Sequence, residues 1–156
     1  MFLMVVVLMA TSCKDDPDPL PPFIARTIFI TSAEITEWPK VQPDGTGWDL
    51  TSAPDVTLSM DDGTTILFQS SVSDNSTQAT FNYPVAKTIT DFTKQHAVGL
   101  WDEDSPDDDD LMAFYTFTIK SYVPTNSNPQ RTDYPSVLEF NTKVGFKVKL
   151  NVIWQE

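Results

Sequence analysis

Regular alternation of apolar and polar residues near the end of the chain is the feature that most constrains the fold. Every second position from 146 to 154 is apolar, and the positions between them include two lysines and an asparagine. A period of two is typical of a β-strand with one face in a core and the other in water. We therefore expect residues 146–154 to form a half-buried strand.

The same pattern recurs in short runs along the chain. We expect a first strand over 24–31, with Ile24, Ile28 and Ile30 on a common side, and Asp61-Asp62-Gly63 predicts a hairpin turn because Asp-Gly readily supplies positive φ. The polar, proline-containing stretch 121–136 predicts a long surface loop, and no segment predicts a helix. Further strands are predicted at 55–60, 64–69, 79–83, 97–101, 112–119 and 137–140. With 24–31 and 146–154 they make seven to eight strands, which predicts an all-β, antiparallel sandwich.

Composition limits the class of partner. The 156 residues carry a net charge of −12, and 40% of them are apolar, which suits one domain with a substantial core. The ten Lys and Arg residues are dispersed, whereas binding to nucleic acid depends on clustered positive charge. The acidity therefore favours cations, or solubility alone, over nucleic acid.

Residues 1–12 form an apolar run that is too short to span a bilayer, and they are typical of an export signal. The segment from Leu8 to Cys13 resembles a bacterial lipobox, which implies that Cys13 is acylated and anchors the mature protein to a membrane. It departs from the commonest pattern, which has Leu where Ala10 stands. A free thiol or a redox residue is the alternative for Cys13, the single cysteine.

Residues 13–22 are acidic and proline-rich, which predicts an extended tether before a folded domain at 23–156. Lys14-Asp15-Asp16 resembles the acidic tags that direct some Gram-negative lipoproteins to the cell surface, although an ordinary polar spacer has the same composition. We expect an outer-membrane lipoprotein of the cell envelope, surface-exposed if the tag is genuine, and a monomer.

Two acidic stretches, 48–55 and 101–111, connect predicted strands. Seven of the nine residues from Asp102 to Asp110 are carboxylates, and so much like charge beside apolar strands is costly unless something neutralises it. Calcium takes six to eight oxygen ligands, which two loops at one end of a sandwich can supply together. The stretches therefore suggest a calcium site, and a solvated run of charge is the alternative for residues 107–110.

The spacing of these aspartates resembles that of the C2 domain, a calcium-dependent, lipid-binding β-sandwich. The resemblance rests on Asp49 and Asp55 before Val56-Thr57-Leu58, then on Trp101-Asp102-Glu103-Asp104 and Asp110-Leu111, and it covers about Ile24 to Trp154. It implies an eight-stranded, C2-like sandwich, with the circularly permuted strand order found in phospholipases. It also implies one or two Ca²⁺ ions held by Asp49, Asp55, Asp102, Asp104 and Asp110, with Asp107 as an auxiliary ligand.

Several residues depart from the family pattern. The family usually has Pro after the second aspartate of its first loop, whereas Val56 follows Asp55 here, and Ala113 replaces a common Gly. The strand predicted at 64–69 has no basic residue, although some members use a Lys-rich strand for phosphoinositides. Calcium binding is less affected by these departures than lipid binding is.

The tryptophans and the histidine are expected to have structural roles. Trp48 and Trp101 precede candidate ligands and could stack on a sugar or enter lipid, but tryptophans in such places usually anchor loops in the core. The single histidine, His96, begins a predicted strand and is expected at the surface or in a capping role. Without a second histidine, zinc has little support, and no nucleophile motif accompanies His96.

The sequence thus predicts a lipid-anchored, non-enzymatic protein with a calcium-binding C2-like domain. The ion would be structural, or it would bridge to an anionic lipid or a glycan. A glycan-binding or adhesive module, with calcium structural or absent, is the second hypothesis, and Trp48 is its candidate platform. A small hydrolase is the third.

Overall fold

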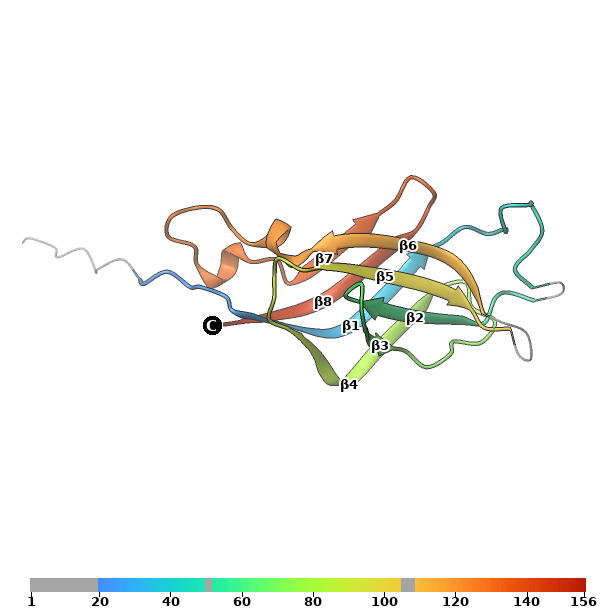
Figure 1. The fold of residues 1–156 in the computed structure, drawn as a ribbon, viewed down its shortest axis with the longest axis horizontal. Coiled ribbons are helices and arrows are strands. Elements are labelled where there is room, and N and C mark those ends of the chain that lie inside the picture. The colour runs from blue at the N-terminus through green and yellow to red at the C-terminus, as the bar shows by residue number, and fades with distance from the viewer. Residues whose placement is uncertain (1–19, 50–51, 105–108) are drawn as a thin grey trace, which may run out of the picture.

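The computed structural model of the protein describes residues 20–49, 52–104 and 109–156. These residues form two stacked antiparallel β-sheets (Figure 1). The strands are β1 (Thr27–Glu37), β2 (Val56–Asp61), β3 (Ile66–Gln69), β4 (Ala79–Ile89), β5 (Gln95–Asp102), β6 (Asp110–Thr118), β7 (Val137–Asn141) and β8 (Lys147–Gln155). Two short 3₁₀ helices, η1 (Ile119–Tyr122) and η2 (Arg131–Asp133), lie between β6 and β7.

Each sheet has four strands. The first has the order β4-β1-β8-β7 and the second has the order β3-β2-β5-β6. The first and last strands of the chain are thus neighbours in the middle of one sheet, and all neighbouring strands are antiparallel. The predicted all-β sandwich of seven to eight strands is confirmed.

The core lies between the two sheets and follows the predicted alternation. In β8 the buried residues are Val148, Leu150, Val152 and Trp154, and Phe146 just before the strand is also buried. In β5 the inward row contains Val98 and Leu100, and the next residue of that row is Asp102. A carboxylate therefore stands where the pattern of the strand directs side chains into the sandwich.

The first strand differs from its prediction at both ends. It begins at Thr27 and continues to Glu37, and Ile24 is 51% exposed instead of sharing the buried side of Ile28 and Ile30. Phe23 takes the inward position, and its ring packs edge-on against Tyr134 with centroids 5.2 Å apart. Tertiary contacts of the segment before the strand, rather than alternation, decide which side chain is buried there.

The connections agree largely with the sequence. Gly63 has a φ of 81°, the positive value that the Asp-Gly turn requires. The stretch 121–136 connects β6 to β7 and includes the two 3₁₀ turns, while no α-helix occurs in the described residues. Among those residues no helix is long and apolar enough to cross a bilayer.

Candidate metal centre

Two loops at one end of the sandwich bring three carboxylates together. Asp102 is the last residue of β5, Asp104 follows it in the loop toward β6, and Asp49 lies in the β1–β2 loop. One carboxylate oxygen from each lies within 4.8 Å of the others, and no further group of this kind occurs among the described residues. We call Asp49, Asp102 and Asp104 the carboxylate cluster.

Burial distinguishes Asp102 from the other two. Its side chain is 1% exposed, whereas Asp49 and Asp104 are partly buried. Oδ1 of Asp102 accepts a hydrogen bond from the backbone N of Asp55 at 3.0 Å, but no described donor reaches the buried Oδ2. A buried acceptor without a donor costs about 1–3 kcal/mol, and more for a charged group.

The pKa of Asp102 reflects this environment. Burial raises it from the ordinary value of 3.8 to about 6, and the negative charges of Asp104 and Asp49 act in the same direction. The hydrogen bond from Asp55 opposes the shift in pKa and does not cancel it. A cation in the cluster would reverse the balance, because it would favour the ionised form.

Asp55 connects the loops around the carboxylate cluster through hydrogen bonds. Its backbone N donates to Asp102, and its backbone O accepts from the backbone N of Glu103 at 2.7 Å. Its own Oδ1 accepts from the backbone N of Asn75 at 2.6 Å. The side chain of Asp55 is thus used to hold a third loop, the one between β3 and β4, next to the two acidic loops.

The β1–β2 loop is fixed by two further contacts beside Asp49. Trp48 is 9% exposed, and its Nε1 donates to the carbonyl of Pro39 at 2.7 Å. A Cβ on Gly47 would lie 2.9 Å from the carbonyl oxygen of Asp49, so only glycine allows this close turn of the backbone. Ser52 Oγ donates to Oδ2 of Asp49 at 3.0 Å, which orients the carboxylate.

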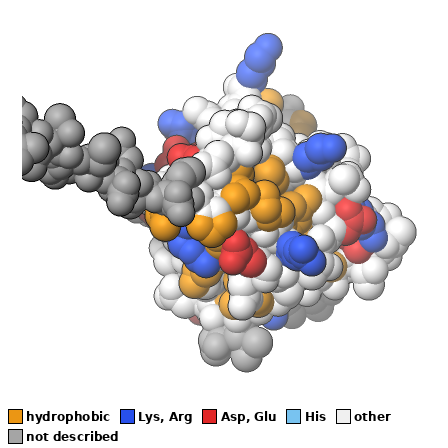
Figure 2. Space-filling model, turned by 90° about the vertical axis from the view of Figure 1, so that its left-hand side faces the viewer, with side chains coloured by type: hydrophobic (Ala, Val, Ile, Leu, Met, Phe, Trp, Pro, Cys, Tyr) orange, Lys and Arg blue, Asp and Glu red, His pale blue; other side chains and the backbone are white. Residues whose placement is uncertain are grey.

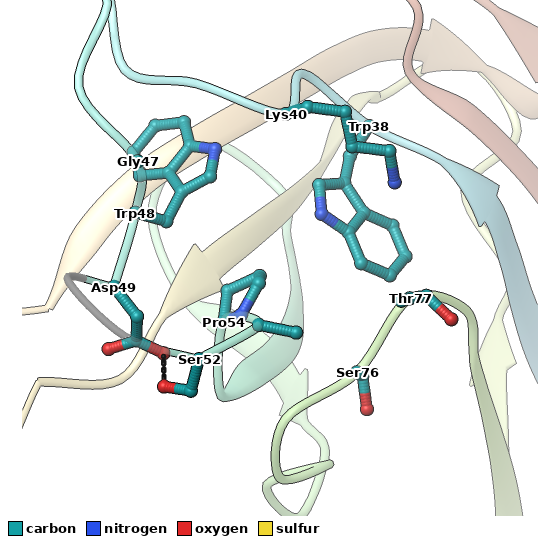
Figure 3. A pocket seen from close by; sticks show the side chains of 10 residues that line it. Trp38, Lys40, Gly47, Trp48, Asp49, Ser52, Pro54, Ser76 and Thr77 are labelled. Carbon is teal, nitrogen blue, oxygen red and sulfur yellow. Dashed lines mark hydrogen bonds between the residues drawn. The ribbon is translucent and has the colours of Figure 1, made fainter.

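A cavity of about 220 Å³ adjoins Asp49 (Figure 3). The indoles of Trp38 and Trp48 and the ring of Pro54 form apolar walls, and Lys40 lies at 4.3 Å from the centre of the Trp38 ring. Trp38 is 2% exposed. Both tryptophans are buried, so the core role expected for Trp48 is confirmed. Its use as a sugar platform stays a prediction.

The structure unites three of the six predicted ligands. Asp55 and Asp110 lie beside the carboxylate cluster but not in it, and Asp110 is exposed at the start of β6, paired in register with Asp102. Asp107 lies outside the described residues, and so does Cys13, together with the rest of positions 1–19. Asp55 and Asp110 therefore stay predicted ligands.

The sequence pattern did not assign two residues to the places that they occupy. Asn75 has a φ of 48° and donates to Asp55, and an Asp-Asn pair in a polar loop is a known signal for such a turn. His96, expected at the surface or in a capping role, is 3% exposed. It belongs to the inward row of β5 with Val98 and Leu100. Starting the predicted strand one residue earlier, at position 96 instead of 97, would have placed His96 in this row.

Comparison with known proteins identifies the fold by structure, but it finds no match by sequence. No protein-family model matches the chain, and no curated protein matches its sequence. Among solved structures, a C2 domain aligns with a TM-score of 0.57 and 16% identity, over 83% of this chain and 98% of that one. A C2 domain of plant extended synaptotagmin 1 aligns with a TM-score of 0.52 and 11% identity, over 85% of this chain and 98% of that one.

A third similar structure is human GIVD cytosolic phospholipase A2, in complex with an inhibitor and terbium chloride. It aligns with a TM-score of 0.53 and 16% identity, over 85% of this chain and 18% of the enzyme. Identities this low show the fold alone. The chain therefore has the C2-type β-sandwich fold, as the spacing of its aspartates predicted.

Proposed function

We propose that this protein binds Ca²⁺ through the carboxylate cluster, with Asp55, Asp110 and Asp107 as further ligands. The hydrogen bonds of Asp55 also hold the loops in place. One observation carries the proposal: a fully buried carboxylate oxygen, Oδ2 of Asp102, has no donor among the described residues and lies beside two other carboxylates. Three clustered carboxylates suit a hard cation that takes oxygen ligands.

The expected effect of the ion is local ordering. Without a cation, the charges of Asp49, Asp102 and Asp104 repel one another. A bound Ca²⁺ would neutralise them and supply the partner that Oδ2 of Asp102 lacks. Because the ligands come from two loops, binding would link the β1–β2 loop to the β5–β6 loop and stabilise the folded domain.

The proposal extends to the place where the protein works. The lipobox-like segment suggests that Cys13 carries a lipid and that the domain is tethered to the outer membrane. Extracellular calcium modules bind with Kd values of about 10⁻⁴–10⁻³ M, which suits an envelope exposed to millimolar calcium. We assign the domain a binding role rather than a catalytic one.

The ion could also bridge to an anionic group, since an ion held by few protein ligands keeps open positions. Pelleting with vesicles of phosphatidylcholine and phosphatidylserine, in calcium and in chelator, tests the lipid version. Calcium-dependent pelleting lost in Asp104→Asn would support it. Equal pelleting in calcium and in chelator would contradict the lipid version, and the ion would then have only a structural role.

The decisive experiment is a melting curve in calcium, in magnesium and in chelator. At 100 times its Kd, calcium should add about 2.7 kcal/mol to the free energy of unfolding, a rise in Tm of about 10 °C. Asp104→Asn should abolish the rise. Glu103→Gln is the matched control, because it removes one negative charge from the same loop but lies outside the carboxylate cluster.

An unchanged Tm of the wild type in about 10 mM calcium would contradict the proposal, because even a Kd of about 10⁻³ M would then add about 1.4 kcal/mol to the free energy of unfolding. A rise that is equal in Asp104→Asn and in Glu103→Gln would also contradict it, because it would show screening of the whole acidic surface rather than binding at one site.

A further inference from the structure

The outward face of the second sheet carries a half-buried tryptophan among exposed apolar side chains. In β5 the outward row includes Gly99 and Trp101, and in β6 the neighbouring outward residues Leu111 and Phe114 are 44% and 59% exposed. Neither Trp101 nor Phe114 belongs to any aromatic pair found among the described residues. Within the described part of the chain, these rings therefore have no aromatic partner.

The indole of Trp101 is held in one orientation. Its Nε1 donates to Oγ of Ser59 on the adjacent strand β2 at 2.8 Å. A Cβ on Gly99 would lie 3.2 Å from Nε1, so glycine at this position lets the ring lie close over the sheet. A ring fixed in this way loses little conformational entropy when a ligand stacks on it.

Two shallow hollows adjoin this indole, and both are lined by Ser59 and Trp101. One, of about 220 Å³, extends over β5 and β6 to Leu111 and Phe114. The other, of about 230 Å³, extends toward β3 and is lined also by Ile66 and Gln69. Together they form a path across the strands, with the tryptophan near its middle.

The charge of this surface restricts the occupant. Asp61 lines the first hollow and Asp109 the second, and neither is lined by a Lys or Arg. Anionic lipid headgroups and acidic glycans would be repelled. A second copy of a chain with a net charge of −12 would be repelled as well.

We infer that the outward face of the β3-β2-β5-β6 sheet binds a neutral glycan, with Trp101 and Phe114 as stacking surfaces. The C–H faces of a pyranose pack on aromatic rings, while its hydroxyls need polar partners at the rim. Gln69 offers donors and an acceptor, and the carboxylates of Asp61 and Asp109 accept from hydroxyls. The stacking residues Trp101 and Phe114 lie outside the carboxylate cluster, and we expect glycan binding without calcium.

Electrophoresis of the full chain through native gels containing one neutral polysaccharide each tests the inference. The probes are hydroxyethylcellulose, xyloglucan, glucomannan, laminarin and dextran. At least one should retard the protein, equally in calcium and in chelator, and Asp104→Asn should be retarded like the wild type. Phe114→Ala should weaken binding about 10-fold, the equivalent of about 1.4 kcal/mol.

Ile153→Ala is the matched control, because Ile153 is 55% exposed on the other sheet, in β8. Trp101→Phe should keep partial binding, and Trp101→Ala should abolish it. The other three tryptophans, Trp38, Trp48 and Trp154, are 9% exposed or less. The bound polysaccharide should therefore protect Trp101 fluorescence from acrylamide.

Retardation by none of the five polysaccharides overturns the inference. Binding that Phe114→Ala leaves unchanged also overturns it, as does sedimentation showing that this face pairs two copies of the chain. Binding that disappears in chelator and in Asp104→Asn would overturn it too, because the glycan would then lie at the calcium site. Calcium-independent binding would stand even if the melting experiment found no effect of calcium.

Discussion

Two aspartates at opposite ends of the same pair of strands show how differently this fold treats a carboxylate. Asp102 ends β5, and Asp62 directly follows β2, which pairs with β5. Oδ1 of Asp62 accepts from the backbone N of Thr64 at 3.1 Å, from Thr64 Oγ1 at 2.7 Å and from the backbone N of Thr65 at 3.0 Å, and Oδ2 pairs with Lys94 at 2.5 Å. Asp102 receives one backbone donor.

The pKa values follow these partners. The ammonium of Lys94, and then the hydroxyl of Thr64, hold the pKa of Asp62 well below its usual range, whereas burial raises the pKa of Asp102 to about 6. The Asp-x-Thr arrangement of Asp62 recurs in two other turns, at Asp44 with Thr46 and at Asp91 with Thr93. A turn can satisfy its own carboxylate, but an inward position at the end of a strand cannot.

The two ends also differ in their surroundings. At the end where the N-terminal segment leaves the domain, apolar side chains lie among both acidic and basic ones (Figure 2). At the other end, the described acidic loops bring Asp49, Asp102 and Asp104 together, and the most buried of them is the one with an oxygen lacking a donor. Acidic and basic side chains thus occur together at the first end, whereas the carboxylate cluster at the other end includes a buried oxygen without a donor among the described residues.

The largest expected effect comes from replacing Asp102. Asp102→Asn should weaken calcium binding by at least about 10- to 100-fold, the loss that even outer partners of a metal site cause. In chelator at pH 7 the variant should melt above the wild type. The amide keeps an acceptor for the backbone N of Asp55, and its NH₂ group can donate to Asp49 and Asp104.

Calcium titrations followed by melting curves measure both effects. A variant that melts below the wild type in chelator would mean that the buried carboxylate is well solvated after all. A variant that gains as much stability from calcium as the wild type, at the same calcium concentrations, would mean that Asp102 is not a ligand, and it would remove the contrast with Asp62.

Much of this architecture could be predicted because it follows local rules. The alternation in β8 and the Asp-Gly turn at Gly63 depend on neighbouring residues only, and both are confirmed. Alternation along β5 also places His96 and Asp102 on the buried side of the strand, because both lie an even number of residues from Val98 and Leu100. Because apolar residues alone define such a pattern, these two polar positions were not assigned to the core row.

The meeting of Asp49 with Asp102 could not be derived from local rules. It depends on which strands pair and on the close turn at Gly47, and the sequence suggested it only through a resemblance in spacing. The use of the Asp55 side chain to hold Asn75 was likewise hidden, because the third loop joins the site through tertiary contacts.

The second effect is a difference in pH dependence without calcium. Because the folded pKa of Asp102 lies near 6, above the ordinary 3.8, its ionised form costs stability at pH 7, and this cost falls as the pH falls through 6. Relative to Asp102→Asn, the wild type should gain about 1 kcal/mol between pH 7 and pH 5. Urea unfolding in chelator at the two pH values measures the gap, and a constant gap would contradict the raised pKa.

A smaller effect is expected at Asp62. Asp62→Asn keeps the acceptor for the turn but loses the ion pair with Lys94, so the Tm at pH 7 should fall by about 2 °C. The fall should shrink in 1 M NaCl, because salt screens a partly exposed pair. In the background of Lys94→Met the same substitution should have almost no effect; an unchanged fall there would show that Lys94 is not the partner that matters.

The smallest effect belongs to His96, and its sign opposes that of Asp102. Burial lowers the pKa of this imidazole below the ordinary 6.5, while the backbone carbonyl of Asp91 and the charge of Asp62 oppose the shift. Its neutral form therefore stabilises the fold, and that contribution is lost as the pH falls below about 6.5.

His96 lies at the same end of the sandwich as Asp62. Urea unfolding should show the wild type losing stability relative to His96→Gln between pH 7 and pH 5. Over the same interval it should gain stability relative to Asp102→Asn. In a profile of the wild type alone, the two contributions would oppose each other, so the two variants are needed to separate them. If His96→Gln instead follows the wild type at every pH, the buried imidazole does not titrate in this range, and only the end with the carboxylate cluster responds to protons.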